Sequence, residues 1–257
     1  MSFYLAHCSD VGNYKSTNQD SYCIKAANTA EYGEILMCVV CDGMGGLQKG
    51  ELASGTVVNE FGLWFENSLP IFVAGKKIDF ELIKKEWNKL ILSVNAKIGN
   101  YGIDNGISLG TTLVALLFID GKAYITNVGD SRIYKIDGKL NRLTHDHSLV
   151  AREIEQGLLS PDQEETDPRR NVLLQCIGAS TIVTPDYDVI QTKKDDIYLL
   201  CSDGFRHEVK EEELLGVLSA NLIDSQQTLQ KTIKDIVELD KTRDEHDNIT
   251  AVAFMVK

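Results

Sequence analysis

The chain has 257 residues, of which 43% are hydrophobic and 25% charged, and its formal net charge at pH 7 is −12. This length and composition are typical of a globular protein that can build one sizeable core. An acidic surface repels phosphate backbones, which argues against a nucleic-acid-binding protein. The sequence shows neither an apolar run as long as a membrane span nor a signal peptide at its start. We therefore expect a cytoplasmic, monomeric protein that has no contact with a membrane.

Short apolar and β-branched runs alternate with longer helical patterns along the chain. Nine runs predict strands, at 3–7, 21–25, 34–41, 111–119, 123–128, 131–136, 187–191, 196–201 and 248–256. Five stretches predict helices, at 50–67, 80–100, 147–156, 210–219 and 225–240. Within 80–100 the apolar side chains recur at the spacing of one helix face.

Tight turns connect several neighbouring strands. Asp120-Gly121 is a typical hairpin dipeptide, and Gly129-Asp130 separates the next two runs. The strands should therefore be mostly antiparallel rather than linked by parallel crossovers. Because the helices come as an early and a late pair, we predict an α+β fold of two antiparallel sheets with helices packed outside. We expect residues 1–257 to form a single domain.

The stretch from Gly157 to Pro185 is the least regular part of the chain and carries a charged run. Its simplest interpretation is a solvated surface excursion. A loop of this length in a compact domain is also often functional, for example as a lid.

Cys38 and Cys41 form a C-x-x-C pair within an apolar run. Residues three apart on a strand point to opposite faces of the sheet, so these two thiols should not share a metal ion. We interpret them as small buried apolar side chains of a protein from a reducing compartment.

Two apolar runs each end in an Asp-Gly pair, Asp42-Gly43 and Asp203-Gly204. A strand that is apolar on both faces is buried, so it holds a terminal aspartate rigidly at the sheet edge. The glycine lets the backbone turn sharply and lets its carbonyl approach a ligand. Asp-Gly is a common turn dipeptide, and one instance would mean little. Two pairs that both end wholly apolar strands are more specific.

Three further aspartates stand at strand ends, because Asp20 and Asp247 precede apolar runs and Asp130 follows one. Antiparallel strands could bring all of these carboxylates to one edge. Clustered carboxylates repel one another unless cations neutralise them. An all-oxygen ligand set suits Mg²⁺ or Mn²⁺. Two such ions about 4 Å apart can share a hydroxide and clamp a phosphoryl group for in-line attack.

The segments around these aspartates belong to a longer series that spans nearly the whole chain. The series is Ser9-Asp10-Val11-Gly12, Asn18-Gln19-Asp20, Asp42-Gly43-Met44-Gly45-Gly46, Leu109-Gly110-Thr111-Thr112, Val128-Gly129-Asp130-Ser131-Arg132, Asp146-His147-Ser148-Leu149-Val150, Cys201-Ser202-Asp203-Gly204 and Asp247-Asn248-Ile249-Thr250. In order and spacing the chain resembles the type-2C, metal-dependent (PPM) serine/threonine protein phosphatases in their compact bacterial form. The resemblance implies a four-layer α-β-β-α sandwich with metal ions in a cleft at one end.

The resemblance also implies a set of metal ligands. Asp42 would bridge two ions, Mn²⁺ or Mg²⁺, and the carbonyl of Gly43 would bind one of them. Asp203 and Asp247 would complete the other site. Asp130, together with Asp203, would serve a third and weaker site.

Two further residues receive roles from the resemblance. Asp20 would hold metal-bound waters, and Lys15 would bind the substrate phosphate. The family usually has Arg in place of Lys15. Lys keeps the positive charge but lacks the planar guanidinium group that can bind a phosphate through two parallel hydrogen bonds. Gln19 replaces the more usual Glu, which removes one negative charge from the surroundings of the metals.

Residues 148 to about 185 would form the flap beside the active site. Asp167 occupies the place of a common flap His, and Leu174-Gln175 replace a usual Thr-Arg pair. We expect these changes to affect the choice of substrate.

The sequence thus predicts hydrolysis of phosphoserine and phosphothreonine in proteins by a metal-bridging hydroxide, with no covalent intermediate. The expected partners are phosphorylated proteins, namely a Ser/Thr protein kinase and its substrates. Two alternatives stay open: a two-metal phosphohydrolase of small phosphate esters, and a non-catalytic phosphoprotein-binding module of the same fold.

Two other motifs have simpler interpretations than a functional site. His145-Asp146-His147 could be a metal cluster, but a loop followed by a helix cap at Ser148 explains it more simply. The glycine-rich segment from Gly43 to Gly50 is not a phosphate-binding loop, because Glu51 stands where that motif needs Lys. We interpret it as the turn into the first helix.

Overall fold

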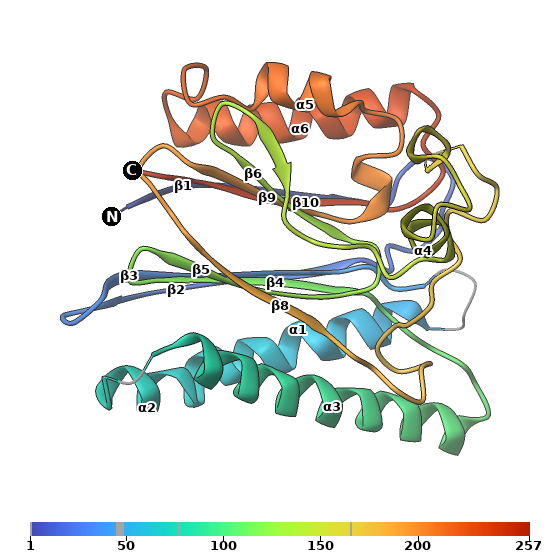
Figure 1. Cartoon of the computed structure of the whole chain (residues 1–257), viewed down its shortest axis with the longest axis horizontal. Helices are drawn as coiled ribbons and strands as arrows, with labels where there is room; N and C mark the ends of the chain where they lie inside the picture. Colours follow the sequence, from blue (N-terminus) through green and yellow to red (C-terminus); the bar gives the residue numbers. More distant parts are fainter. Residues whose placement is uncertain (1, 45–48, 77, 165) are drawn as a thin grey trace.

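The computed structural model describes residues 2–44, 49–76, 78–164 and 166–257. Within them, ten strands form two five-stranded antiparallel sheets that lie face to face, with helices on both outer faces (Figure 1). The predicted α-β-β-α sandwich of the α+β class is confirmed. None of the helices in the described part of the chain has the length and apolar content that crossing a membrane requires.

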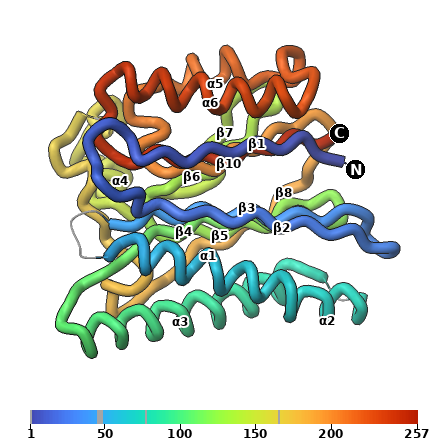
Figure 2. Tube along the Cα trace, turned by 180° about the vertical axis from the view of Figure 1, so that it is seen from behind, coloured from blue at the N-terminus to red at the C-terminus, as the bar shows by residue number. Residues whose placement is uncertain are grey.

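The first sheet contains both ends of the chain, in the order β1-β10-β9-β6-β7. Its strands are β1 (Phe3–Asp10), β6 (Arg132–Ile136), β7 (Leu140–Arg142), β9 (Ile197–Cys201) and β10 (Ile249–Val256). Phe3 lies opposite Val256 and Asp10 opposite Ile249, so the first and last strands run side by side (Figure 2). Helices α5 (Glu211–Val217) and α6 (Gln226–Thr242) cover its outer face (Figure 1).

The second sheet has the order β2-β3-β4-β5-β8. Its strands are β2 (Ser21–Thr29), β3 (Gly33–Cys41), β4 (Leu113–Ile119), β5 (Lys122–Val128) and β8 (Asp186–Gln191). Helices α1 (Gly50–Asn67), α2 (Leu69–Ala74) and α3 (Phe80–Asn105) lie on its outer face (Figure 1).

Three apolar layers hold the four structural layers together, and the alternation of side chains along β3 shows why. Cys38 packs between the two sheets, in a cluster that includes Leu200 of the facing sheet. Cys41 packs on the other face of β3, in a cluster that includes Trp87 of α3. The two thiols therefore point to opposite faces, as the sequence predicts, and both are free.

The predicted elements are all present, with shifted ends. Residues 111–112 lie outside β4, because Thr111 forms only isolated bridges to Gly43 and Ile177. The helix predicted from 80 to 100 continues to Asn105 and ends at Gly106, which adopts a left-handed φ of 63°.

Sequence patterns missed the short elements. The three-residue strand β7, the six-residue helix α2 and the one-turn helices η1 (Pro161–Gln163) and η2 (Asp203–Phe205) were not predicted. Elements this short contain too few residues to show a period. Part of the glycine-rich turn, residues 45–48, lies outside the described residues.

Candidate active site

The predicted strand-end aspartates meet at one end of the sandwich, opposite the chain termini (Figure 1). Ser21 at the start of β2 pairs with Cys41 at the end of β3, which brings Asp20 beside Asp42. The negative charges of Asp20, Asp203, Asp247 and Asp130 all act on the carboxyl group of Asp42. The antiparallel arrangement therefore assembles the carboxylate cluster, which we define as these five residues.

Backbone hydrogen bonds fix Asp42 in place. Its N–H donates to Thr112 Oγ1 at 2.9 Å, and its carbonyl accepts from Thr111 Oγ1 at 2.8 Å. A Cβ on Gly43 would lie 2.3 Å from the carbonyl oxygen of Gln19, so no other residue fits there without a backbone shift. The glycine of this Asp-Gly pair is needed for close packing around the cluster.

The second Asp-Gly pair is packed just as closely. A Cβ on Gly204 would lie 2.2 Å from the carbonyl oxygen of Asn248, so the segments that carry Asp203 and Asp247 are in backbone contact. The side chain of Asn248 accepts from Gln19 N–H at 2.8 Å and donates to the carbonyl of Val11 at 2.9 Å. Asn248 therefore joins the loop before β2 to the cluster.

Asp20, Asp130 and Asp203 of the cluster are buried, and the carboxylates of the cluster repel one another. Burial and then the neighbouring carboxylates raise the pKa of Asp42 well above its ordinary range. The same causes raise the pKa of Asp130 to about 7. Burial also raises the pKa of Asp20 to about 7, although hydrogen bonds from Thr250 and Ser202 act in the opposite direction.

Asp203 is the exception within the cluster. Burial opposes its ionisation, but the positive charges of His207 and Arg206 and a hydrogen bond from Asp42 together lower its pKa. One carboxylate oxygen of Asp203 and one of Asp20 are buried without a hydrogen-bond partner among the described residues. Buried acceptors of this kind need a cation or water.

The residues present therefore fit divalent cations. The cluster offers carboxylate and backbone oxygens, which are the donors that Mg²⁺ and Mn²⁺ prefer. A cation would also relieve the repulsion that raises the pKa values of the buried acids.

Comparisons with known proteins identify the family of this chain. Residues 13–240 match the family described as Protein phosphatase 2C. Protein phosphatase PhpP of Streptococcus pneumoniae is 32% identical over 240 residues, which are 90% of this chain and 91% of PhpP. The chain belongs to the protein phosphatase 2C family. It is therefore a metal-dependent phosphatase of phosphoserine and phosphothreonine in proteins.

Solved structures of relatives confirm the fold. Serine/threonine phosphatase Stp1 from Staphylococcus aureus is 27% identical, with a TM-score of 0.87 over 100% of this chain and 96% of Stp1. The catalytic domain of the phosphatase PstP, solved in complex with two manganese ions, is 24% identical, with a TM-score of 0.77 and 99% of both chains covered. At 24% identity, the similarity to PstP shows a shared fold alone.

In this phosphatase Lys15 lies at the rim of the cluster. Its Nζ is 3.0 Å from Asp247 Oδ1, and both side chains are about one-third exposed. Partial burial alone would lower the pKa of Lys15, but the carboxylate of Asp247 and the charges of Asp42 and Asp203 raise it. Lys15 is thus a cation that faces the cluster.

Among the described residues, the hydrogen-bond partners of Gln19 lie outside the carboxylate cluster. Its Nε2 donates to Glu51 Oε2 at 3.2 Å, and its backbone carbonyl accepts from Gly43 N–H and from Ser54 Oγ. The side chain therefore braces the start of α1 against the loop before β2.

The strand and helix patterns did not single out two residues behind the cluster with buried side chains, His207 and Glu245. His207 Nε2 lies 3.6 Å from Asp203 Oδ2, and His207 Nδ1 lies 3.5 Å from Glu245 Oε2. The other oxygen of Glu245 accepts from the backbone N–H groups of His246 and Asp247, both at 2.8 Å. Glu245 and His207 thus connect two cluster aspartates from behind.

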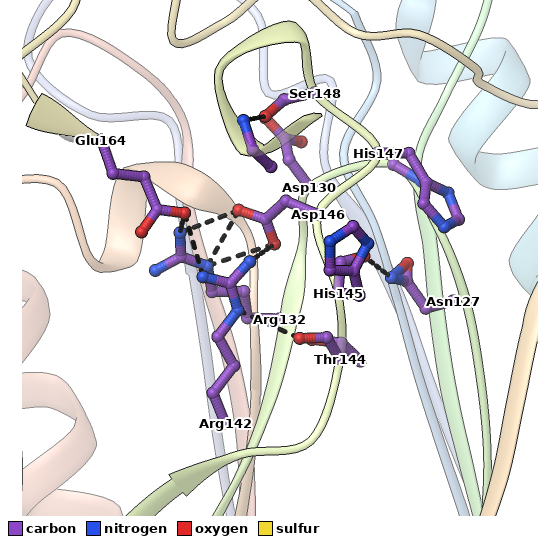
Figure 3. Close-up of polar contacts among 12 residues, drawn as sticks. Asn127, Asp130, Arg132, Arg142, Thr144, His145, Asp146, His147, Ser148 and Glu164 are labelled. Atoms are coloured by element: carbon purple, nitrogen blue, oxygen red, sulfur yellow. Dashed lines mark hydrogen bonds and ion pairs between the residues drawn. The ribbon is translucent and has the colours of Figure 1, made fainter. Parts of the chain in front are cut away.

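The start of the flap is anchored by a buried ion network. Asp146 lies 2.8 Å from Arg132 Nη2 and 2.6 Å from Arg142 Nη2. Glu164, within the flap, accepts from both arginines. Figure 3 shows these groups converging close to Asp130. Burial opposes ionisation of Asp146, yet the arginines lower its pKa.

His147 joins the two ends of the flap. Its Nδ1 lies 3.2 Å from the N–H of Gly129 and 2.8 Å from Gln175 Nε2. The backbone of Thr184 sets the orientation of Gln175, because Oε1 accepts from its N–H at 2.7 Å and Nε2 donates to its carbonyl at 2.9 Å. Two donors therefore face His147 Nδ1, which must be the acceptor.

This tautomer decides the interpretation of the histidine motif. His145, His147 and Asp186 offer ligand atoms within 4.8 Å of one another. However, the proton of His147 is placed on Nε2, which faces Asp186 Oδ2 at 3.1 Å. A metal ion bound to Nε2 would move the proton of His147 to Nδ1. The Nδ1–H group would then face two other donors, the N–H of Gly129 and the Nε2 of Gln175. The helix cap is present, since Ser148 Oγ accepts from Ala151 N–H at 3.1 Å.

Proposed function

We propose that this phosphatase hydrolyses phosphoserine and phosphothreonine directly, using a water activated at the carboxylate cluster. The observation that carries the proposal is the meeting of five aspartates at one edge, three of them buried, with raised pKa values on Asp20, Asp42 and Asp130. Two Mn²⁺ or Mg²⁺ ions, when bound, would supply a nucleophilic water and neutralise the charge that develops on the phosphoryl group.

Each cluster residue has a proposed role. Asp42 would bridge the two ions, with the Gly43 carbonyl as a further ligand. Asp203 and Asp247 would bind the second ion, and Asp203 with Asp130 would bind a third, weaker one. The solved PstP complex with two manganese ions supports this number for the two principal sites.

Lys15 and Asp20 would act on substrate and water. Lys15 would exchange its contact with Asp247 for the substrate phosphate, as a point charge. Asp20 would orient water through the carboxylate oxygen that has no partner among the described residues.

A covalent enzyme intermediate is not part of the proposal. The thiols are the most nucleophilic neutral side chains, and burial raises the pKa of all six. None is therefore poised as a thiolate.

The test is phosphate release from a phosphoserine peptide with Mn²⁺, with EDTA, and in Asp42→Asn. We expect EDTA to abolish release, Mn²⁺ to restore it, and Asp42→Asn to lower kcat on the order of a thousandfold. Asp195→Asn is the control, because Asp195 contacts Lys257 near the chain terminus. Calorimetric titration with Mn²⁺ should show binding to the wild type and weak binding to Asp42→Asn.

Other outcomes would select an alternative. Activity that survives both EDTA and Asp42→Asn would contradict the metal-activated water. Release of phosphate from small esters but not from phosphopeptides would favour a small-molecule phosphohydrolase. A folded wild type that binds phosphopeptides without hydrolysing them would be a binding module.

We also propose a single-domain, monomeric enzyme of the cytoplasm that opposes a Ser/Thr protein kinase. Pairing of β1 with β10 closes residues 3–256 into one unit, which supports a single domain. Six free cysteines are typical of a reducing compartment. Gel filtration tests whether the protein is a monomer. Co-purification with a Ser/Thr protein kinase tests whether such a kinase is its partner.

A further inference from the structure

An exposed aromatic ring is held rigidly beside the phosphate-binding lysine. Tyr14 is 51% exposed. Its ring nevertheless stacks on His246, with centroids 3.9 Å apart and planes 15° apart. Its hydroxyl donates to the carboxylate of Asp244. Fixing a side chain costs conformational entropy, and here little burial offsets that cost. A pre-ordered, half-exposed ring is the arrangement that recognition surfaces use.

The position of the ring relates it to the substrate. Tyr14 is the neighbour of Lys15, and His246 is the neighbour of Asp247, so the stacked pair borders the Lys15–Asp247 contact. Asn13 Nδ2 donates to the carbonyl of Lys241 at 3.0 Å, which ties the residue before Tyr14 to the end of α6. Adjacent Cα atoms are about 3.8 Å apart, so the ring lies within reach of residues that flank a phosphoresidue held at Lys15.

The charge around the Tyr14 ring determines which type of substrate side chain can bind to it. His246 covers one face of Tyr14, which leaves the other for a ligand. Asp244 is exposed and, among the described residues, has no cation within ion-pair distance. An aromatic face beside a carboxylate that has no cationic partner attracts a guanidinium or ammonium group. The net charge of −12 acts in the same direction and repels acidic peptides.

We infer that Tyr14 and Asp244 form a subsite for an arginine or lysine that flanks the phosphorylated residue of the substrate protein. The cation stacks on the open face of Tyr14 and pairs with Asp244, while Lys15 holds the phosphate. This subsite rests on the proposed function, because it selects among the phosphopeptides that the carboxylate cluster hydrolyses.

The test compares phosphopeptides that differ only by Arg or Ala at one of the three positions on either side of phosphoserine. At the best position the wild type should show a kcat/KM about three- to tenfold higher for the Arg peptide. Tyr14→Ala and Asp244→Asn should each reduce this Arg/Ala ratio, the first to about one. Tyr14→Phe keeps the ring and should retain most of the preference.

The ratio separates recognition from folding, because a damaged fold lowers the rates for both peptides together. Ile71→Ala is the control, since Ile71 is exposed on α2 at the other end of the molecule (Figure 1) and should leave the ratio unchanged. p-Nitrophenyl phosphate, which has no flanking residue, reports the chemical step alone.

Two results would overturn the inference: equal rates for Arg and Ala peptides at every position, or a full Arg/Ala ratio in Tyr14→Ala. Hydrolysis of p-nitrophenyl phosphate with no hydrolysis of any phosphopeptide would instead overturn the proposed function, and the subsite with it.

Discussion

Two buried polar regions lie next to each other in this phosphatase, and they treat charge in opposite ways. In the carboxylate cluster the acids face one another, and the pKa of Asp42 is raised by burial and by like charges. The second region, which we call the flap anchor, is the buried ion network of Asp146, Glu164, Arg132 and Arg142. In it Asp146 faces the two arginines, and its pKa is lowered despite burial. Asp130 borders both regions, since the charge of Asp146 also acts on it.

The difference separates structure from function. The flap anchor contains both signs of charge and is complete as folded, so it serves to hold the flap. The carboxylate cluster has one sign of charge and orphaned oxygens, so it is complete only when cations bind. Opposite responses to mutation, pH and metal therefore follow for the two regions.

The largest expected effect is in the flap anchor. Asp146→Asn removes the buried carboxylate that Arg132 and Arg142 share, leaving them with Glu164, and should lower the free energy of unfolding by about 3–5 kcal/mol. Urea denaturation in EDTA measures it. Asp235→Asn is the control, because Asp235 forms an exposed pair with Lys231 on α6 and should change stability by less than about 1 kcal/mol. A similar, small change in both variants would contradict the anchor.

In the carboxylate cluster without metal, removing a carboxylate should raise the free energy of unfolding relative to the wild type as pH rises, instead of lowering it. Asp130 has a folded-state pKa of about 7, against about 4 when unfolded, so the folded protein binds more protons between these pH values. Stability from this group is present below pH 4 and is lost as pH rises to about 7. In EDTA the wild type should therefore lose about 2–3 kcal/mol relative to Asp130→Asn between pH 4.5 and 7.5.

Metal should reverse this trend, because ions compete with protons for the carboxylates. Thermal melts across the same pH range, with and without Mn²⁺, measure both slopes. At a hundred times its Kd, one bound ion adds about 2.7 kcal/mol. If the stabilities of the wild type and Asp130→Asn changed in parallel with pH in EDTA, the raised pKa of Asp130 would not be the cause of the loss.

The comparison also explains what the sequence could predict. Each cluster aspartate stands at the end of an apolar run, so the strand period and the antiparallel order place Asp42 and Asp203 without further information. The ion pairs of Arg132 with Asp146 and Glu164 cannot be found in this way, because they join residues 14 and 32 positions apart that meet through tertiary packing alone. Gln19 illustrates the same limit, since its contact with Glu51 depends on how α1 packs.

His207 and Glu245 carried weaker signals that periodicity does not use. His207 follows Asp203 by four residues across a helical turn, and Glu245 precedes Asp247 by two. Both spacings favour contact with a cluster aspartate. Neither spacing shows that the two side chains also face each other, which required the fold.

The smallest expected effect tests whether that pair belongs to the cluster or only to the core. Glu245→Gln keeps an oxygen for the N–H groups of His246 and Asp247 but removes the charge that faces His207. His207 then holds Asp203 less firmly, and residues behind metal ligands typically alter affinity by about tenfold or more. We expect about tenfold weaker Mn²⁺ binding by calorimetry, with little loss of stability in EDTA. Glu213→Gln, which breaks an exposed pair with Arg243, is the matched control and should leave Mn²⁺ affinity unchanged. Reduced stability with wild-type Mn²⁺ affinity in Glu245→Gln would assign the pair to the core.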